Sequence, residues 1–413
     1  MNNYKVMFYL RILKSIVKTF LDSFLVLYFL DVSSNNILPL GIYKLVAIFT
    51  IYAIMFFTKD FCKSKNRIYL TRIGIIINFI YFATIIGLRE NVVNHIYLIG
   101  FLYGLEEGFY YSMYNNLESS LIENKERARF TGNYTSVNAL LSIILPLIFG
   151  SLIKRAGFIK VLSIVLIIAV AQIILSFIIK DKNIPKETKA DLKGYREIVK
   201  NNKKIQAEYN TQFFNGLTYS EGAFSYIVTI YIIKVFSDSV SLGIFTSIFS
   251  LLSALIGLLF AKYIKPKYYN AIMKIGMACT IFLLCLMIYR CNMVTIIAFN
   301  FVSTFSKGIM DLINGNAESN ISNIEIIKNK YKVEYWLGIE TALFKGRILS
   351  NGMFILMALI GSDIMMYIFV IFLGLYGLSS IRLQKELKDN AIEIGENNEK
   401  SWDNFERVES RFK

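Results

Sequence analysis

Two acidic residues stand alone in the middle of long apolar runs, where a charge is rare enough to suggest a function. Asp22 lies in the first run and Glu221 in a later one. A carboxyl group held in a cavity of low dielectric constant can bind and release a proton near neutral pH. Charged groups at membrane depth also tend to face water-filled cavities. Asp22 and Glu221 are therefore candidates for proton or cation coupling.

Two further stretches each carry one polar or aromatic face at the spacing i, i+4, i+7, i+11 of an α-helix. The members are Glu107, Tyr111, Tyr114 and Glu118 in the first stretch, and Lys307, Asp311, Asn314 and Glu318 in the second. Such faces are costly toward lipid, so we expect them to meet across water or a solute. Glu106 and Tyr110 lie beside the first face, and the tyrosines could stack on a flat or cationic solute.

Plain structural explanations exist for the same residues. Opposite charges at helical spacing can neutralise each other, and the pairs placed to do so are Lys18 with Asp22, Lys307 with Asp311, and Glu340 with Arg347. For the pair seven residues apart, Glu340 and Arg347, a packing ion pair is favoured. Aromatic packing between helices explains any single tyrosine equally simply.

A gate is the favoured role for the acidic residues near the ends of their runs. Glu118 and Glu318 would lie close to basic loops, where residues such as Arg67 and Arg127 could hold them. We therefore expect these four residues at a cytoplasmic gate.

The elements that must position all these groups are transmembrane helices. The 413 residues are 55% hydrophobic, with a mean hydropathy of +0.49. A hydrocarbon core of about 30 Å needs about 20 apolar residues in a helix. Twelve runs meet this need, and the sequence predicts an all-α integral membrane protein with spans near 12–31, 37–57, 69–88, 94–117, 134–153, 159–179, 208–233, 240–261, 269–289, 293–316, 336–361 and 363–383.

The orientation follows from the basic residues, because loops rich in Lys and Arg stay in the cytoplasm. Most of the 45 Lys and Arg residues fall on the side of the membrane that would hold the N-terminus. We therefore expect both termini to be cytoplasmic, in the plasma membrane.

The chain also repeats itself with a period of about 200 residues. The stretch with Gly108, Asn116, Glu118 and Ser119 is matched by one with Gly308, Asn316, Glu318 and Ser319. Asp22 and Glu221 keep nearly the same offset. This predicts two pseudo-symmetric six-helix halves, 1–180 and 208–383. Between them, 181–207 would be a basic amphipathic linker on the inner leaflet, and 384–413 a tail that is a frayed helix or disordered.

Other function classes find little support. The net charge of +15 sits in short loops between apolar runs, so nucleic-acid binding is not expected. Cys62 stands alone and the other cysteines are six apart in one region, which indicates packing rather than metal binding. The only histidine, His95, falls at an interfacial turn. The sequence has no phosphate loop or nucleophile motif, so we expect no enzyme, metal or cofactor.

Several short motifs resemble those of the major facilitator superfamily. The loop after the second run keeps part of that family's charged motif, as Lys59, Asp60, Lys63, Lys65 and Arg67, without its glycines. Residues 126–132 resemble the usual start of span five, and 338–350 the start of span eleven in members from low-GC bacteria. The antiporter signature of span five is reduced to Leu145, Pro146 and Gly150. The resemblance implies a monomer whose spans one, four, seven and ten line a central cavity, with alternating access.

Together these observations predict a secondary active transporter for a small organic solute, driven by protons, with export favoured over uptake. The mixture of acids, lysines and tyrosines suits a cationic, a zwitterionic or an aromatic solute equally. A membrane sensor or scaffold on the same fold is the alternative, and only vectorial flux separates the two.

Overall fold

The computed structural model describes residues 3–63, 68–122, 124–179, 189–263, 268–361 and 366–409. Within these ranges all regular elements are helices, as expected, and none is a strand. Nine stretches of the described chain are long and apolar enough to cross a membrane, one of them joining the third and fourth predicted spans as Ile68–Ser112. The described structure thus has the all-helical make-up of a multi-pass membrane protein.

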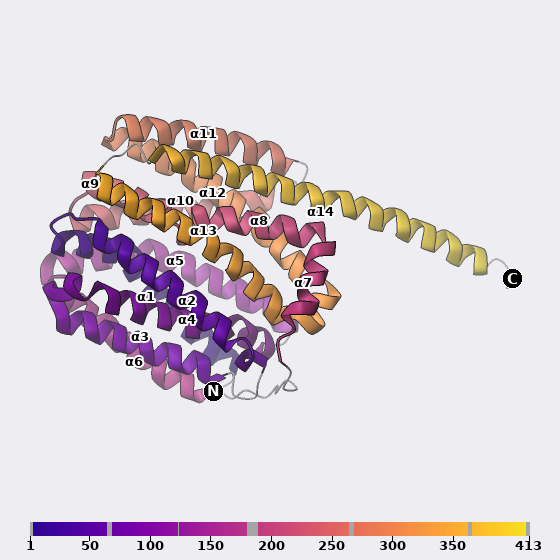
Figure 1. The fold of residues 1–413 in the computed structure, drawn as a ribbon, viewed down its shortest axis with the longest axis horizontal. Helices are drawn as coiled ribbons and strands as arrows, with labels where there is room; N and C mark the ends of the chain where they lie inside the picture. The colour runs from indigo at the N-terminus through magenta and orange to yellow at the C-terminus, as the bar shows by residue number, and fades with distance from the viewer. Residues whose placement is uncertain are drawn as a thin grey trace.

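The first half consists of six long helices and two short turns. These are α1 (Asn3–Val32), α2 (Leu38–Thr58), η1 (Phe61–Lys63), α3 (Ile68–Leu88), η2 (Arg89–His95), α4 (Ile96–Leu121), α5 (Asn124–Ala156) and α6 (Phe158–Ile178). A helix α7 (Leu192–Asn201) follows as the linker. In Figure 1 the N-terminus and α7 lie at the same end of the molecule, which we call the linker end; the opposite end is the far end.

The second half repeats this arrangement with one helix divided. Its elements are α8 (Lys203–Leu217), α9 (Ala223–Val235), α10 (Ser239–Tyr263), α11 (Tyr269–Tyr289), α12 (Met293–Ser322), the π-helical turn η4 (Ile327–Tyr331), α13 (Lys332–Ile360) and α14 (Met366–Glu409). The halves meet chiefly where α2 packs on α13 and α5 on α10. In Figure 1, α2 and α13 run side by side at this junction.

Small residues let helices of the first half approach closely. Gly100, Gly104 and Gly108 recur every four residues on α4 and face α2. A Cβ atom at Gly100 would lie 2.6 Å from the carbonyl oxygen of Tyr43, and one at Gly104 would lie 2.5 Å from Thr50 Cβ. This spacing of small residues is typical of helix contacts in membranes, where packing replaces the hydrophobic effect.

The seventh predicted span, 208–233, is not one helix. It is divided at residues 218–222 into α8 and α9, and Glu221 lies in this break with a φ of +57°. The stretch contains Gly216, Ser220 and Gly222, residues common in turns, but the groups that stabilise the break come from α13 and lie far away in the sequence. Glu221 is therefore presented by a loop inside the bundle, whereas Asp22 is presented by the continuous helix α1.

The structure adds detail to the expected linker and tail. The amphipathic helix α7 does not need lipid to cover its apolar face, because Tyr195 is buried against Ile205, Tyr331 and Tyr335 of the second half. The last span and the tail form one helix, α14, which extends beyond the bundle in Figure 1. Gln384 to Leu387 continue its helix-forming sequence without Pro or Gly.

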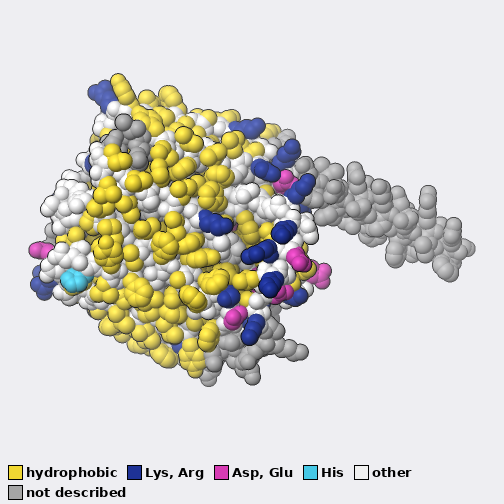
Figure 2. Space-filling model, viewed as in Figure 1, with side chains coloured by type: hydrophobic (Ala, Val, Ile, Leu, Met, Phe, Trp, Pro, Cys, Tyr) yellow, Lys and Arg dark blue, Asp and Glu magenta, His cyan; other side chains and the backbone are white. Residues whose placement is uncertain are grey.

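The surface has the pattern of a protein surrounded by lipid. In Figure 2 hydrophobic side chains cover most of the face shown, and the Lys and Arg side chains gather mainly toward the linker end. Exposed residues of the described chain include large hydrophobic ones such as Ile167 and Leu378. An apolar belt of this kind is stable only in a bilayer or a similar environment.

Candidate functional site

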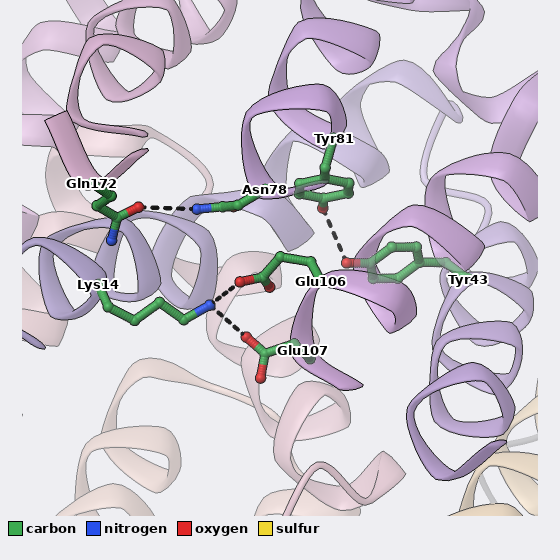
Figure 3. A network of polar contacts seen from close by, with 7 residues as sticks. All are labelled: Lys14, Tyr43, Asn78, Tyr81, Glu106, Glu107 and Gln172. Carbon is green, nitrogen blue, oxygen red and sulfur yellow. Dashed lines mark hydrogen bonds and ion pairs between the residues drawn. The ribbon is translucent and has the colours of Figure 1, made fainter. Parts of the chain in front are cut away.

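A buried charge cluster joins α1 to α4 in the first half. The Lys14 Nζ atom donates to Glu106 and, at 2.9 Å, to Glu107 Oε1. All three residues are at least nine-tenths buried. Figure 3 shows the lysine reaching across from α1 between the two carboxylates of α4. One ammonium group thus satisfies both acids in the protein interior, and it fixes where α1 sits against α4.

Neutral polar pairs hold the neighbouring helices around this cluster. The hydroxyl groups of Tyr43 and Tyr81 lie 3.1 Å apart and link α2 to α3, and Asn78 Nδ2 donates to Gln172 Oε1 at 3.3 Å between α3 and α6. Both pairs are buried and appear with the charge cluster in Figure 3. The first half is therefore tied together by side chains from continuous helices.

In the second half a buried ion pair holds the broken backbone. Arg347 on α13 contacts Glu340 Oε1 at 2.6 Å through Nη1. Its Nε atom donates to the carbonyl oxygen of Ser220 at 2.7 Å, and Nη2 donates to Ser220 Oγ at 3.1 Å. Each of the three guanidinium nitrogens therefore has a partner, and the side chain anchors the residue that precedes Glu221.

Ser350, one turn further along α13, bridges the two ends of the break. Its Oγ atom donates to the carbonyl oxygen of Leu217, the last residue of α8, and accepts from the backbone N–H of Ala223, the first residue of α9, each at 2.8 Å. Helix ends inside a membrane need such partners, because no lipid group can replace them. Together with Arg347, Ser350 stabilises the bend that turns Glu221 toward the centre.

Lys18 lines three adjoining cavities, of which the two larger lie between the halves. We call the cavity of about 470 Å³ toward the linker end the linker-side compartment, and the cavity of about 450 Å³ beyond Glu221 the far-side compartment. A smaller one of about 270 Å³, lined by Arg11, Lys14 and Asn138, lies between α1, α4 and α5. Glu221 lines both larger compartments, so it marks the boundary between them.

The predicted site residues distribute unevenly over these cavities. Asp22, Tyr110 and Tyr111 line the smallest cavity. Asp22 also lines the far-side compartment, and Tyr111 also lines the linker-side compartment. The linker-side compartment also includes Glu107, Asp311, Asn314, Glu318, Glu340 and Arg347. Glu106 lines none of the three. The side chains of Tyr114, Glu118 and Arg127, and Arg67 altogether, lie outside the described residues.

The expected neutralisation along single helices differs from the structure. Among the described residues, neither Lys18 with Asp22 nor Lys307 with Asp311 lies within ion-pair distance. Lys307 instead lies over the ring of Tyr219, 5.1 Å from its centroid. The Lys307 side chain lines the far-side compartment while Asp311 lines the linker-side one. Each charge therefore faces a cavity rather than its neighbour on the helix.

Some site residues were missed from the sequence. Lys14 follows the pattern Lys14, Lys18, Asp22 at i, i+4, i+8 on one face of α1, and this spacing could have revealed it. Lys44 is visible in the sequence as a charge within an apolar run, but its place 5.3 Å from the Tyr103 ring centroid depends on the packing of α2 on α4.

A second missed feature joins the halves at the linker end. Lys63 Nζ contacts Glu334 Oε1 at 2.5 Å, and the same oxygen accepts from the backbone N–H of Asp191 at 2.8 Å. Nearby, Asp60 accepts from the N–H of Ala190 at 2.9 Å. Glu334 on α13 thus holds both the loop after α2 and the start of the linker. We call this set the linker-end latch.

The latch also contains a titratable helix cap. Asp191 Oδ1 accepts from the backbone N–H of Gly194 at 2.9 Å, at the first turn of α7. This hydrogen bond, followed by one from the Tyr331 hydroxyl, lowers the pKa of Asp191 below its ordinary value.

Comparisons with known proteins agree with this architecture. A family model described as Major Facilitator Superfamily matches residues 38–323. An uncharacterized protein of Bacillus subtilis (strain 168), YqgE, is 23% identical over 374 residues, which cover 86% of this chain and 85% of the relative.

Two solved structures share the fold at low identity. One is a bacterial homologue of the iron transporter ferroportin in an inward-facing state (TM-score 0.61, 10% identity), and the other is the human organic anion transporter MFSD10 (TM-score 0.62, 13% identity). In each case the similarity covers 92% of this chain and 98% of the other. The chain belongs to the Major Facilitator Superfamily, as a membrane transporter and not an enzyme.

Proposed function

We propose that the protein is a proton-coupled secondary active transporter that moves a small organic solute across the plasma membrane, export being favoured over uptake. The observation that carries this proposal is the polar cavity between the halves, to which Asp22 contributes from α1 and Glu221 from the break between α8 and α9. In this proposal α8 and α9 together form one of twelve spans, both termini are cytoplasmic and the protein is a monomer.

Proton coupling is assigned to the two carboxyl groups at the centre. Asp22 and Glu221 line the same compartment as Lys18, and neither forms an ion pair within the described chain. Loading or unloading a proton would change the charge facing the solute, and so couple binding to the gradient. Glu221 is placed to respond most directly, because it lies where the two larger compartments meet.

Alternating access needs contacts between the halves that can open. At the far end, Ser239 Oγ on α10 donates to the carbonyl oxygen of Gly150 on α5 at 2.9 Å, and a Cβ atom at Gly243 would overlap the carbonyl of Pro146. At the linker end, the latch built on Glu334 joins α13 to the first half. We propose that these two contact regions are the gates on either side.

The cytoplasmic gate would include the residues assigned to it from the sequence. Glu318 lines the linker-side compartment and accepts from Gln212 Nε2 at 3.0 Å. Its repeat equivalent Glu118, with Arg67 and Arg127, would complete this gate around the latch. Release of the latch would then open the linker-side compartment to the cytoplasm.

The test compares solute pools inside and outside cells that express the native protein or the Asp22→Asn, Glu221→Gln double variant at equal membrane abundance. A compound redistributed only by the native chain identifies a substrate candidate and the direction of flux. The same compound is then measured in proteoliposomes with an imposed pH gradient. The matched control is Glu197→Gln, which neutralises an exposed acid on α7 outside the cavity and should transport normally.

The outcomes separate the parts of the proposal. Flux that persists in both single variants with unchanged pH dependence would contradict the proton assignment. Accumulation inside cells would replace export by uptake. Binding of a solute without flux under any gradient would favour the sensor or scaffold on the same fold.

A further inference from the structure

The charges that face the cavity are sorted by sign along its length. The linker-side compartment carries the carboxylates of Asp311 and Glu318, and the far-side compartment carries the ammonium groups of Lys44 and Lys307. Lys18 and Glu221 lie at the boundary between them. We infer that the transported solute is a zwitterion, held with its positive group in the linker-side compartment and its negative group in the far-side compartment. This inference rests on the proposed function, because it takes the cavity as the substrate site.

The residues of α12 that line the linker-side compartment present hydrogen-bond acceptors to it. Asp311, Asn314 and Glu318 follow one another along α12 and all line it. Asn314 is nine-tenths buried, and its Nδ2 donates to Tyr376 and Ser380, but its Oδ1 has no partner within the described chain. An ammonium group donates in three directions and would satisfy such a set. A carboxylate there would meet like charges instead.

Two basic groups of the described chain line the linker-side compartment: Lys18 lies at its boundary beside Glu221, and Arg347 is already engaged. Arg347 makes its contacts with Glu340 and with Ser220, and it is buried. Glu107 is likewise bonded to Lys14. When these ion-paired groups are set aside, the acids Asp311 and Glu318 remain to face the solute; Glu318 is bonded only to the neutral amide of Gln212. The compartment therefore has an unbalanced negative charge.

The far-side compartment has the opposite balance. Lys44 lies 5.3 Å from the Tyr103 ring centroid and Lys307 lies 5.1 Å from that of Tyr219, so aromatic faces support both ammonium groups in place of carboxylates. Among the described residues, two acids line the far-side compartment. Glu221 also lines the linker-side compartment, whereas Asp22 does not. A solute carboxylate or phosphate would complete the charge balance here.

The helix geometry sets the separation of the two ends. Lys307 and Asp311 are four residues apart on α12, which corresponds to a rise of about 6 Å, and Lys307 to Asn314 corresponds to about 10 Å. The charged groups of the solute should therefore be separated by about 6 to 10 Å. A solute with one charge would leave the other compartment uncompensated, which is unfavourable in a site of low dielectric constant.

The experiment measures binding to the purified full-length protein in nanodiscs without any gradient. Trp336 lines the linker-side compartment and provides the fluorescence signal once Trp402, the other tryptophan, is replaced by Phe. The probes are ω-amino acids of four to ten carbons, each compared with the alkylamine and the carboxylate of the same length, and phenylalanyl-glycine compared with its N-acetylated and amidated forms. We expect the zwitterions to bind at least about tenfold more tightly than either singly charged partner.

Charge variants test the orientation. Lys307→Gln should remove the advantage of the zwitterion over the amine and leave amine binding unchanged. Asp311→Asn should remove its advantage over the carboxylate and leave carboxylate binding unchanged. Lys274→Gln, which neutralises an exposed lysine on α11, is the control and should change nothing. Far-UV circular dichroism and thermal unfolding verify that each variant is folded.

Several results would overturn the inference. These are equal binding of a singly charged probe, loss of all probes to the same extent in both variants, and absence of saturable binding by any zwitterion. Failure of the proposed function looks different, because the binding pattern would persist while flux in proteoliposomes is absent. Gradient-driven flux of a singly charged solute would instead retain the transporter and refute the zwitterion.

Discussion

Asp22 and Glu221 occupy equivalent places in the two halves, yet the protein holds them by different means. Asp22 projects from the unbroken helix α1, which Lys14 ties to α4 through two carboxylates. Glu221 projects from a five-residue break, which Arg347 ties to α13 through the backbone. Sequence repetition thus preserves the position of an acid but not the structure that presents it. The broken half gives its acid a conformation that depends on a few buried hydrogen bonds.

The largest effects are expected from removing the basic residue of each cluster. Lys14→Met leaves two buried carboxylates without a counter-charge, and Arg347→Met leaves Glu340 unpaired and Ser220 without its partner. Each should lower the free energy of unfolding by about 3 to 5 kcal/mol. Equilibrium unfolding in mixed micelles measures both.

Neutralising the acids of each cluster distinguishes a cluster that holds only side chains from one that also holds the backbone. Glu106→Gln with Glu107→Gln should restore most of the stability lost in Lys14→Met, because the first cluster holds only side chains. Glu340→Gln should restore less in Arg347→Met, because the contact with the Ser220 backbone is still missing. Equal recovery in the two halves would contradict the distinction between them.

The next largest effect on stability is expected from adding a methyl group at a glycine that contacts a neighbouring helix. A Cβ atom at Gly346 on α13 would overlap the carbonyl oxygen of Phe213 on α8, beside the break. Gly346→Ala should therefore lower the free energy of unfolding by about 1 to 3 kcal/mol and displace the backbone of α8 beside the break. Gly352→Ala is the matched control on the same helix, since nothing lies within 4 Å of its Cβ position, and it should be neutral or stabilising by up to about 1 kcal/mol. A similar loss in both variants would show that the close contact at Gly346 does not explain the result.

Hydropathy was sufficient to locate the helices but not the break. A helix is found at each of the twelve predicted runs, with the seventh divided, because an apolar run of membrane length has few alternatives to a helix. That all twelve cross the membrane stays a prediction. The break depends on Arg347 and Ser350, which are more than 100 positions away from it in the chain. No local pattern in 208–233 could reveal those partners.

The sequence likewise predicted part of the candidate site and not the rest. Helical spacing identified Asp311, Asn314 and Glu318 as one face, and they do line one compartment. The same spacing suggested a pairing of Lys307 with Asp311, whereas Lys307 turns to Tyr219 on another element. Spacing along a helix thus predicts which groups share a face, but the neighbouring helices decide which of them interact.

A smaller effect of opposite sign in the two halves is expected for glycine at the central acids. Glu221 has a φ of +57°, a conformation that costs a non-glycine residue about 1 kcal/mol or more. Glu221→Gly should therefore leave stability unchanged or raise it slightly. Asp22→Gly in the middle of α1 should lower it by about 0.3 kcal/mol, the difference in helix propensity between the two residues. Thermal unfolding measures both, with Glu221→Gln and Asp22→Asn as controls for the lost charge.

The smallest effect is expected in the linker, which belongs to neither half. The pKa of Asp191 is lowered in the folded protein, so its carboxylate stabilises the start of α7 at a pH above its ordinary pKa of 3.8, and this contribution is lost as the pH falls below 3.8 through the folded pKa. Asp191→Asn caps the helix at any pH and should remove this dependence. A spin label at residue 197 on α7, in a background without native cysteines, should become more mobile below pH 3.8 in the native chain and not in Asp191→Asn. Equal mobility changes in both would mean that α7 loosens for a reason other than its cap. The latch residue Glu334, which accepts from the Asp191 backbone, would then be the group to neutralise.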